Sequence, residues 1–141
     1  MVHISKRKVS AKVLAEMKTQ LVNIFFVQNS RKNFESVLYN LLTPSEHILL
    51  AKRVMAIGLL DLGYSTYQVS ELLCMSPTTL GKIQNKVENT DSFSSITKTL
   101  KTSRGRKIFI ENLVALLTPG GASKKLQQQL YTDIDKWKSG M

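Results

Sequence analysis

The sequence predicts an all-α protein of about six or seven helices, on the basis of three observations. Apolar residues recur at helical spacing in one segment after another, and several of these segments begin with residues that start helices. No segment alternates apolar and polar residues long enough to indicate a strand. The hydrophobic fraction of 43% in a chain of 141 residues is sufficient for an ordinary core.

Two helices are expected before residue 43. Ser10 can cap the first, which should run to about Gln28. Its apolar positions follow helical spacing: Val13, Leu14, Met17, Leu21, Ile24, Phe25 and Val27. A second helix is expected over about 31–42, with an apolar side made by Phe34, Val37, Leu38 and Leu41.

The sequence Thr43-Pro44-Ser45-Glu46 is a strong helix start. Thr43 is expected as the N-cap, Pro44 as the first helical residue, and Glu46 as the partner that completes a capping box. The helix should stop at Gly63. Its residues are apolar nearly all round, so we expect it to be the central buried helix: Ile48, Leu49, Leu50, Val54, Met55, Ile57, Leu59, Leu60 and Leu62.

Residues 66–86 have the pattern of a helix-turn-helix, in which two short helices are joined by a tight turn. Ser65 should begin the first helix, which ends at Cys74; Ser76 should cap the second, with Pro77 at its first position and its end near 87 or 88. Small residues are needed at the helix crossing and at the turn, where Ser70 and Cys74 stand. Apolar residues occupy the positions that would lock the pair together: Val69, Leu73, Met75, Leu80 and Ile83.

The remaining positions of the second helix are polar or small, which suits contact with base edges in the major groove of double-stranded DNA. Hydroxyls and amides pair with base edges, a threonine methyl contacts thymine, and lysine meets guanine or phosphate. The candidate DNA-binding residues are Ser76, Thr78, Thr79, Gly81, Lys82, Gln84, Asn85 and Lys86. The alternative interpretation is an ordinary helical hairpin with a solvated polar face.

A set of residues within 34–88 forms a further pattern: Leu42-Thr43-Pro44-Ser45-Glu46, Arg53-Val54, Leu59-Leu60, Gly63, Ser65, Thr79-Leu80 and Asn85. In these residues the region resembles the Trp repressor-like helix-turn-helix family. The resemblance implies an all-α obligate dimer with interwound N-terminal helices. From the helix-turn-helix we expect sequence-specific binding of double-stranded DNA by a transcriptional regulator.

The tryptophan site of that family is not carried over. Arg53 matches one of the family's two arginines, but Lys82 stands where the other would be and Lys86 stands where a serine would help to hold the ligand. Lysine does not reproduce the planar, bidentate contacts of arginine. We therefore expect no cofactor and no tryptophan binding, and interpret Arg53 either as a structural ion-pair residue or as a ligand contact. No effector is indicated by the sequence.

The positive charge lies on the two flanks of the motif. Residues 1–43 have 7 basic and 2 acidic side chains, residues 44–89 have 4 of each, and residues 90–141 have 9 basic and 4 acidic, within a total of +10. This surplus indicates an anionic partner, either nucleic acid or, less often, an anionic membrane. Residues 101–107 are interpreted as a basic linker whose Arg104, Arg106 and Lys107 form a minor-groove arm on DNA; the alternative is a solvated linker.

The flanks contain further expected features. Lys6-Arg7-Lys8 is either an N-terminal arm on phosphates or a frayed terminus. Beyond the motif, a weak helix is expected over 96–100, helices over 106–117 and 123–138, and a turn at 118–121. We divide the chain into a DNA-binding and dimerisation domain, 1–89, and a basic linker with a C-terminal helical extension, 90–141.

Several classes of protein are disfavoured. No catalytic pair, nucleophile with its base, or phosphate loop is found, and the single Cys74 with two distant histidines makes no metal cluster. The apolar stretch 21–27 is too short to span a membrane, so a cytoplasmic protein is expected. The N-terminal helix and the helix over 44–62 have more apolar surface than a short chain can cover alone, which predicts a symmetric homodimer. The rival to DNA binding is an interaction or scaffold module whose basic flanks bind an acidic partner; RNA binding is a third option that the narrow A-form groove disfavours.

Overall fold

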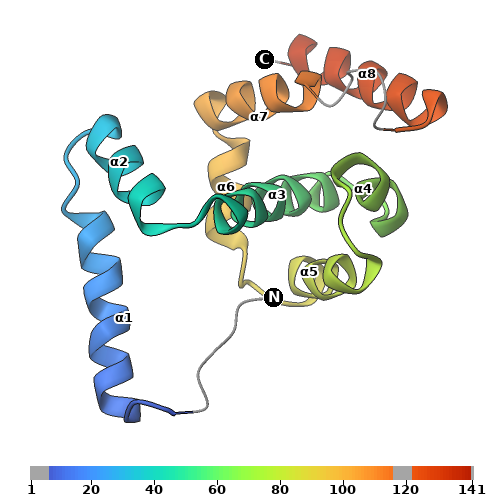
Figure 1. Cartoon of the computed structure of the whole chain (residues 1–141). Helices are drawn as coiled ribbons and strands as arrows, with labels where there is room; N and C mark the ends of the chain where they lie inside the picture. The colour runs from blue at the N-terminus through green and yellow to red at the C-terminus, as the bar shows by residue number, and fades with distance from the viewer. Residues whose placement is uncertain (1–6, 116–121, 141) are drawn as a thin grey trace. The chain divides into compact units, whose positions relative to one another are not determined.

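The computed structural model describes residues 7–115 and 122–140, and all the regular structure in these ranges is α-helical (Figure 1). The all-α prediction is confirmed. Eight helices occur in the described ranges because residues 94–101 form a full helix of their own. They are α1 (Ala11–Phe26), α2 (Arg31–Leu41), α3 (Pro44–Asp61), α4 (Thr66–Leu73), α5 (Pro77–Asn89), α6 (Ser94–Lys101), α7 (Ser103–Ala115) and α8 (Lys124–Ser139).

The chain groups into two compact units, Met1–His47 and Ile48–Met141. In the first unit, Ser10 caps α1 as expected, its hydroxyl oxygen accepting the Val13 N–H at 3.3 Å. The rings of Phe25 and Phe34 join α1 to α2, with centroids 5.2 Å apart. Neither of these two helices contains a buried residue.

Both ends of α3 follow from the sequence. Thr43 and Glu46 form the expected capping box: the Glu46 carboxylate accepts the Thr43 N–H at 2.8 Å, and the Thr43 hydroxyl accepts the Glu46 N–H at 3.2 Å. The Thr43 backbone N–H, and then its hydroxyl, hold the pKa of Glu46 below its usual value. At the other end, Gly63 adopts a positive φ of +96°, which ends the helix. The Gly63 N–H then donates to the Leu60 carbonyl oxygen, and the Tyr64 N–H donates to the Leu59 carbonyl oxygen.

The expected burial of α3 is confirmed only for its second half. Ala56 to Leu60 are buried, whereas Ile48, Leu49 and Leu50 are more than 40% exposed. The expectation that the whole helix is central and buried is therefore wrong for the described chain. The buried residues of α3 are thus confined to 56–60, toward its C-terminal end.

One hydrophobic core joins the helix-turn-helix to the C-terminal helices. Its largest fully buried side chains come from α3, α4, α5, α7 and α8: Ile57, Leu59, Val69, Leu80, Leu113, Leu130 and Ile134. Packing thus places these helices in one unit, whereas the sequence analysis divided the chain after residue 89.

Residues 101–107 are not a linker. Lys101 ends α6 and Ser103 begins α7, so Thr102 alone separates the two helices. The Thr102 hydroxyl accepts the Gly105 N–H at 3.1 Å, and a Cβ on Gly105 would collide with the Thr99 carbonyl oxygen. Glycine is therefore required by close packing at this junction, and Arg104, Arg106 and Lys107 belong to the first turns of a helix rather than to a flexible arm. The expected turn at 118–121 and Lys6 of the N-terminal arm lie outside the described residues.

Within residues 7–115 and 122–140, no helix has both the length and the apolar character needed to cross a membrane.

Contacts between residues that are far apart in the sequence attach α8 to α4 and to the segment that follows α3. The Tyr64 hydroxyl donates to a carboxylate oxygen of Asp133 at 2.6 Å, and the Ser123 N–H donates to Glu71 at 2.7 Å. The Tyr64 ring also meets Trp137 edge-on, with centroids 6.5 Å apart. Burial, and next the bond to Asp133, raise the pKa of Tyr64 above its ordinary value.

Removing the Tyr64 hydroxyl should therefore weaken the attachment of α8. Tyr64→Phe is expected to lower the free energy of unfolding by about 1.5–3 kcal/mol at pH 7, as for other hydrogen bonds to charged groups. Because the folded-state pKa is raised, this contribution is complete below the unfolded-state pKa of about 10 and is lost as the pH rises through the folded-state value.

Tyr131→Phe is the matched control in urea denaturation, since Tyr131 also lies on α8, is 59% exposed, and has no hydrogen bond within the described ranges. Its change should stay within about 0.5 kcal/mol. An equal loss of stability in the two variants at pH 7 would contradict the assignment.

Candidate nucleic-acid interface

The turn between α4 and α5 fixes the geometry of the motif. Cys74 ends α4 in the left-handed conformation, at φ 52° and ψ 51°, where glycine is favoured because a Cβ is disfavoured. The Ser70 hydroxyl donates to the Met75 carbonyl oxygen at 2.7 Å, and Lys52 on α3 reaches the Cys74 carbonyl oxygen at 3.5 Å. Ser76 then caps α5, with Pro77 at its first position.

The inner face of the motif is apolar, as the sequence predicts. Val69 and Leu80 are completely buried, and Leu73 and Ile83 nearly so. Met75 is partly buried and packs against this core. Because these residues face inward, the rotation of α5 about its axis is fixed and its remaining positions face outward.

Six of the eight candidate residues on α5 and its cap are exposed: Ser76, Thr78, Gly81, Lys82, Asn85 and Lys86. Thr79 and Gln84 are partly buried. We call these eight residues the outer face of α5. The structure thus brings them together on one surface, which is the arrangement that the sequence pattern predicts.

Several side chains of the outer face already have partners. Ser76 donates its hydroxyl hydrogen to Thr79 at 2.8 Å, Gln84 donates to Glu88 at 2.8 Å, and Asn85 accepts from Asn89 at 2.7 Å. In contrast, Thr78 and Lys82 make no side-chain hydrogen bond or ion pair with any residue that the structure describes. These two are the groups most available to an incoming molecule.

Gly81 lies in the interior of α5 on this same face. A Cβ added to it would meet no heavy atom within 4 Å, so no packing in the described structure requires glycine here. Glycine in an exposed helix interior costs about 1 kcal/mol of stability relative to alanine. The chain therefore retains a destabilising residue where its own fold has no need of one.

A hollow of about 220 Å³ adjoins the outer face, between α3 and α5. It is lined by Arg53, Thr79, Lys82, Ile83, Lys86 and Phe93. Its three cations have no acidic residue beside them in this lining, and the Lys86 ammonium lies 5.7 Å from the centre of the Phe93 ring. Arg53 makes no ion pair within the described ranges, so the interpretation of Arg53 as a structural ion-pair residue is wrong for this part of the chain.

The three basic residues near the start of α7 lie elsewhere. Arg104 and Lys107 are exposed, whereas Arg106 is partly buried and lines a different cavity. Figure 1 shows α5 and α7 on opposite sides of α3. The structure therefore does not join these residues to the outer face of α5 in one surface. The sequence does not indicate this separation, because the composition of residues 101–107 is that of a basic linker.

Comparisons with family models, with curated proteins and with solved structures find no match to this chain.

Proposed function

We propose that the protein is a sequence-specific, double-stranded DNA-binding protein of the helix-turn-helix type, acting as a transcriptional regulator. The main observation in support is the outer face of α5, which is held outward by a buried inner face and is open at Gly81. In a helix-turn-helix the second helix enters the major groove and its N-terminal residues contact base edges.

The chemistry of the outer face suits that role. The hydroxyl and methyl groups of Thr78 can contact base edges, and Lys82 can contact guanine or phosphate. Arg53 and Lys86, at the adjoining hollow, add positive charge for the sugar-phosphate backbone. Glycine at position 81 lets the helix backbone approach a groove floor more closely than any other residue would allow.

The same observations argue against an ordinary solvated hairpin. A hairpin whose outer face meets only water would be more stable with alanine at position 81, because nothing packs against that position. Three cations also line the hollow beside Thr79 without a carboxylate to neutralise them. Their mutual repulsion would bring no benefit to a hairpin that meets only water.

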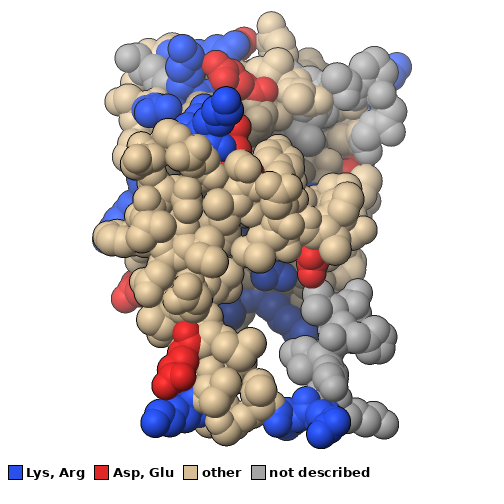
Figure 2. All heavy atoms as spheres, turned by 60° about the vertical axis from the view of Figure 1, so that its left-hand side comes forward, with Lys and Arg blue, Asp and Glu red and all other residues tan. Residues whose placement is uncertain are grey.

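We further propose that the protein is a symmetric homodimer of the Trp repressor-like kind. A seam of large apolar residues with heptad spacing runs along α1: Leu14, Met17, Leu21 and Ile24, each between 38% and 55% exposed. Ile48, Leu49 and Leu50, at the start of α3, are exposed as well. Figure 2 shows that charged side chains are sparse over much of the face that it draws. Pairing of two copies would cover the seam of α1, and a dimer of this kind would present two α5 helices to successive major grooves about one helical turn apart.

The dimer hypothesis is tested by placing a charge on the seam. Leu21→Glu should convert a dimer into a monomer at micromolar concentration, because a carboxylate would have to be buried without a partner. Thr19→Glu, about half a helical turn away on the same exposed helix, adds the same charge off the seam and should leave the dimer intact. Sedimentation equilibrium measures both. A monomeric mass for the unmodified protein would overturn the proposal.

The DNA-binding hypothesis is tested with two lysine substitutions of equal charge. A preferred duplex is first selected from a random pool. Lys82→Ala should then lose roughly 1–3 kcal/mol of binding free energy on that duplex and less on a random one, because base contacts specify sequence. Lys107→Ala, on the other side of α3, should change either affinity little.

Fluorescence anisotropy on both duplexes distinguishes the outcomes. If Lys82→Ala weakens the preferred and random duplexes alike, α5 does not read sequence. If Lys107→Ala is the more harmful variant on both duplexes, the residues at the start of α7 contact phosphates as a basic surface of their own.

The second candidate is a protein-interaction module that binds an acidic partner. Its support is the exposure of Arg104 and Lys107 on the side of α3 away from α5. Two results together would favour this candidate over DNA binding. The selection would enrich no duplex, and the protein would bind an acidic polypeptide such as poly-glutamate in a salt-sensitive manner.

A further inference from the structure

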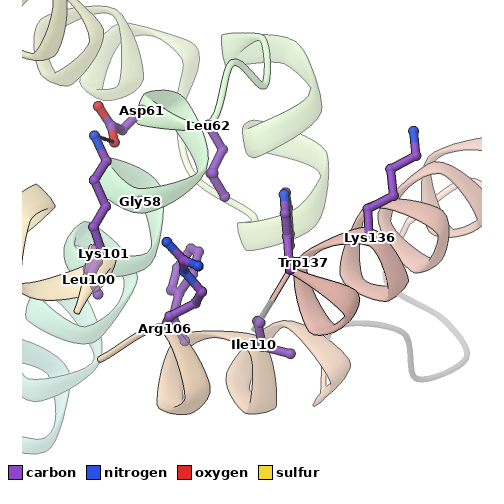
Figure 3. A pocket seen from close by; sticks show the side chains of 11 residues that line it. Gly58, Asp61, Leu62, Leu100, Lys101, Arg106, Ile110, Lys136 and Trp137 are labelled. Carbon is purple, nitrogen blue, oxygen red and sulfur yellow. Dashed lines mark ion pairs between the residues drawn. The ribbon is translucent and has the colours of Figure 1, made fainter. Parts of the chain in front are cut away.

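A second cavity, of about 310 Å³, lies within the unit Ile48–Met141 and is separate from the outer face of α5. Residues of α3, α6, α7 and α8 line it, and Figure 3 shows Arg106 extending from α7 into the space between Leu100 and Trp137. Leu62 closes the same space from the end of α3. This cavity plays no part in the proposed DNA contacts.

The charges around the cavity leave an excess of cations. Lys101 pairs with Asp61 at 3.0 Å, so these two neutralise each other at one rim. Arg106 and Lys136 also line the cavity and make no ion pair with any residue in the ranges 7–115 and 122–140. Asp61 is the only acidic residue among the described lining residues. The cavity therefore favours a ligand with at least one negative charge.

The walls are otherwise apolar. They are made by Leu62, Leu100, Phe109, Ile110 and Trp137. Phe109 and Ile110 are buried in the core, whereas Trp137 is only partly buried and leaves part of its indole ring open to the cavity. The volume is about twice that of an engineered cavity of ~150 Å³ that binds benzene, and it lies at the lower end of the range for small-molecule sites. A bicyclic body, or one ring with a short chain, would fit.

We infer that this cavity binds a small amphiphilic anion: an apolar, ring-containing body with a single carboxylate. The carboxylate would meet the Arg106 guanidinium, whose planar fork suits bidentate pairing with a carboxylate. The body would lie against Trp137 and Leu62. This inference goes beyond the proposed DNA binding and does not depend on it.

Partial burial is what makes Arg106 differ from the other basic residues of α7. A carboxylate that meets an arginine next to apolar walls is shielded from water, so their hydrogen bonds are stronger than those of an exposed pair. Arg104 and Lys107 are exposed and line no part of this cavity. One turn of helix thus contains both solvent-facing cations and one cation directed into an apolar space.

The test uses naphthalene-1-acetate and its uncharged amide, naphthalene-1-acetamide, as probes on the full chain. Trp137 is the chain's only tryptophan, so its indole N–H gives one unambiguous signal in a proton–nitrogen correlation spectrum. We expect the acid to shift this signal in a saturable manner and to bind at least tenfold more tightly than the amide by calorimetry. Arg106→Gln should weaken binding of the acid about tenfold or more, and Lys98→Gln, an exposed position of α6 outside the cavity, should not.

Each other outcome contradicts the inference. Equal binding of acid and amide would show an apolar hollow without anion selectivity. No binding of the acid at millimolar concentration would show that the cavity takes no such ligand. Binding without a shift of the Trp137 signal would place the ligand elsewhere. The signal is measured on the unmodified protein, so the inference remains testable even if Arg106→Gln does not fold.

Discussion

Burial of the C-terminal half of α3 is the packing constraint on which the second unit depends. Ala56, Ile57 and Leu59 are almost inaccessible to water, and the core around them includes residues of α4, α5, α7 and α8. Burial of large aliphatic side chains contributes about 1.5–3 kcal/mol each, so this segment is a main source of stability. Because α5 lies on one side of α3 and α7 on the other, the same burial separates the outer face of α5 from the basic start of α7 (Figure 1).

The rest of α3 has a different environment. Its first half also contains large apolar residues, yet Ile48, Leu49 and Leu50 are exposed, like the seam of α1. Exposed apolar surface of this extent is typical of an interface between subunits rather than of a monomer's surface. The proposed dimer thus explains why a helix that is apolar nearly all round is only half buried in one chain.

Local features could be predicted from the sequence because their causes lie within a few residues. The caps at Ser10, Ser65 and Ser76 and the capping box at Thr43 form as expected, since each depends on one side chain and the next turn of backbone. The inward positions of the helix-turn-helix were predicted for the same reason, because helical spacing determines which residues share a face.

Features that depend on residues far apart could not be predicted. Arg104-Gly105-Arg106 has the composition of a flexible linker, but Gly105 is required because α6 and α7 approach too closely for a Cβ. The bond from Tyr64 to Asp133 spans 69 residues, and no local pattern indicates it. The cavity around Arg106 and Trp137 is equally hidden in the sequence, because four separate helices contribute to its walls.

The central claim, that α5 is shaped for close approach to DNA, is tested most directly by Gly81→Ala. The proposal requires stability and binding to change in opposite directions. Urea denaturation should show a gain of roughly 0.5–1 kcal/mol in the free energy of unfolding, because an added methyl group meets no neighbour in the chain and alanine favours the helix. Affinity for the selected duplex should fall by about 1 kcal/mol or more, because that methyl group would collide with the groove. A variant that is stabilised and binds the duplex as tightly as the unmodified protein would contradict the account.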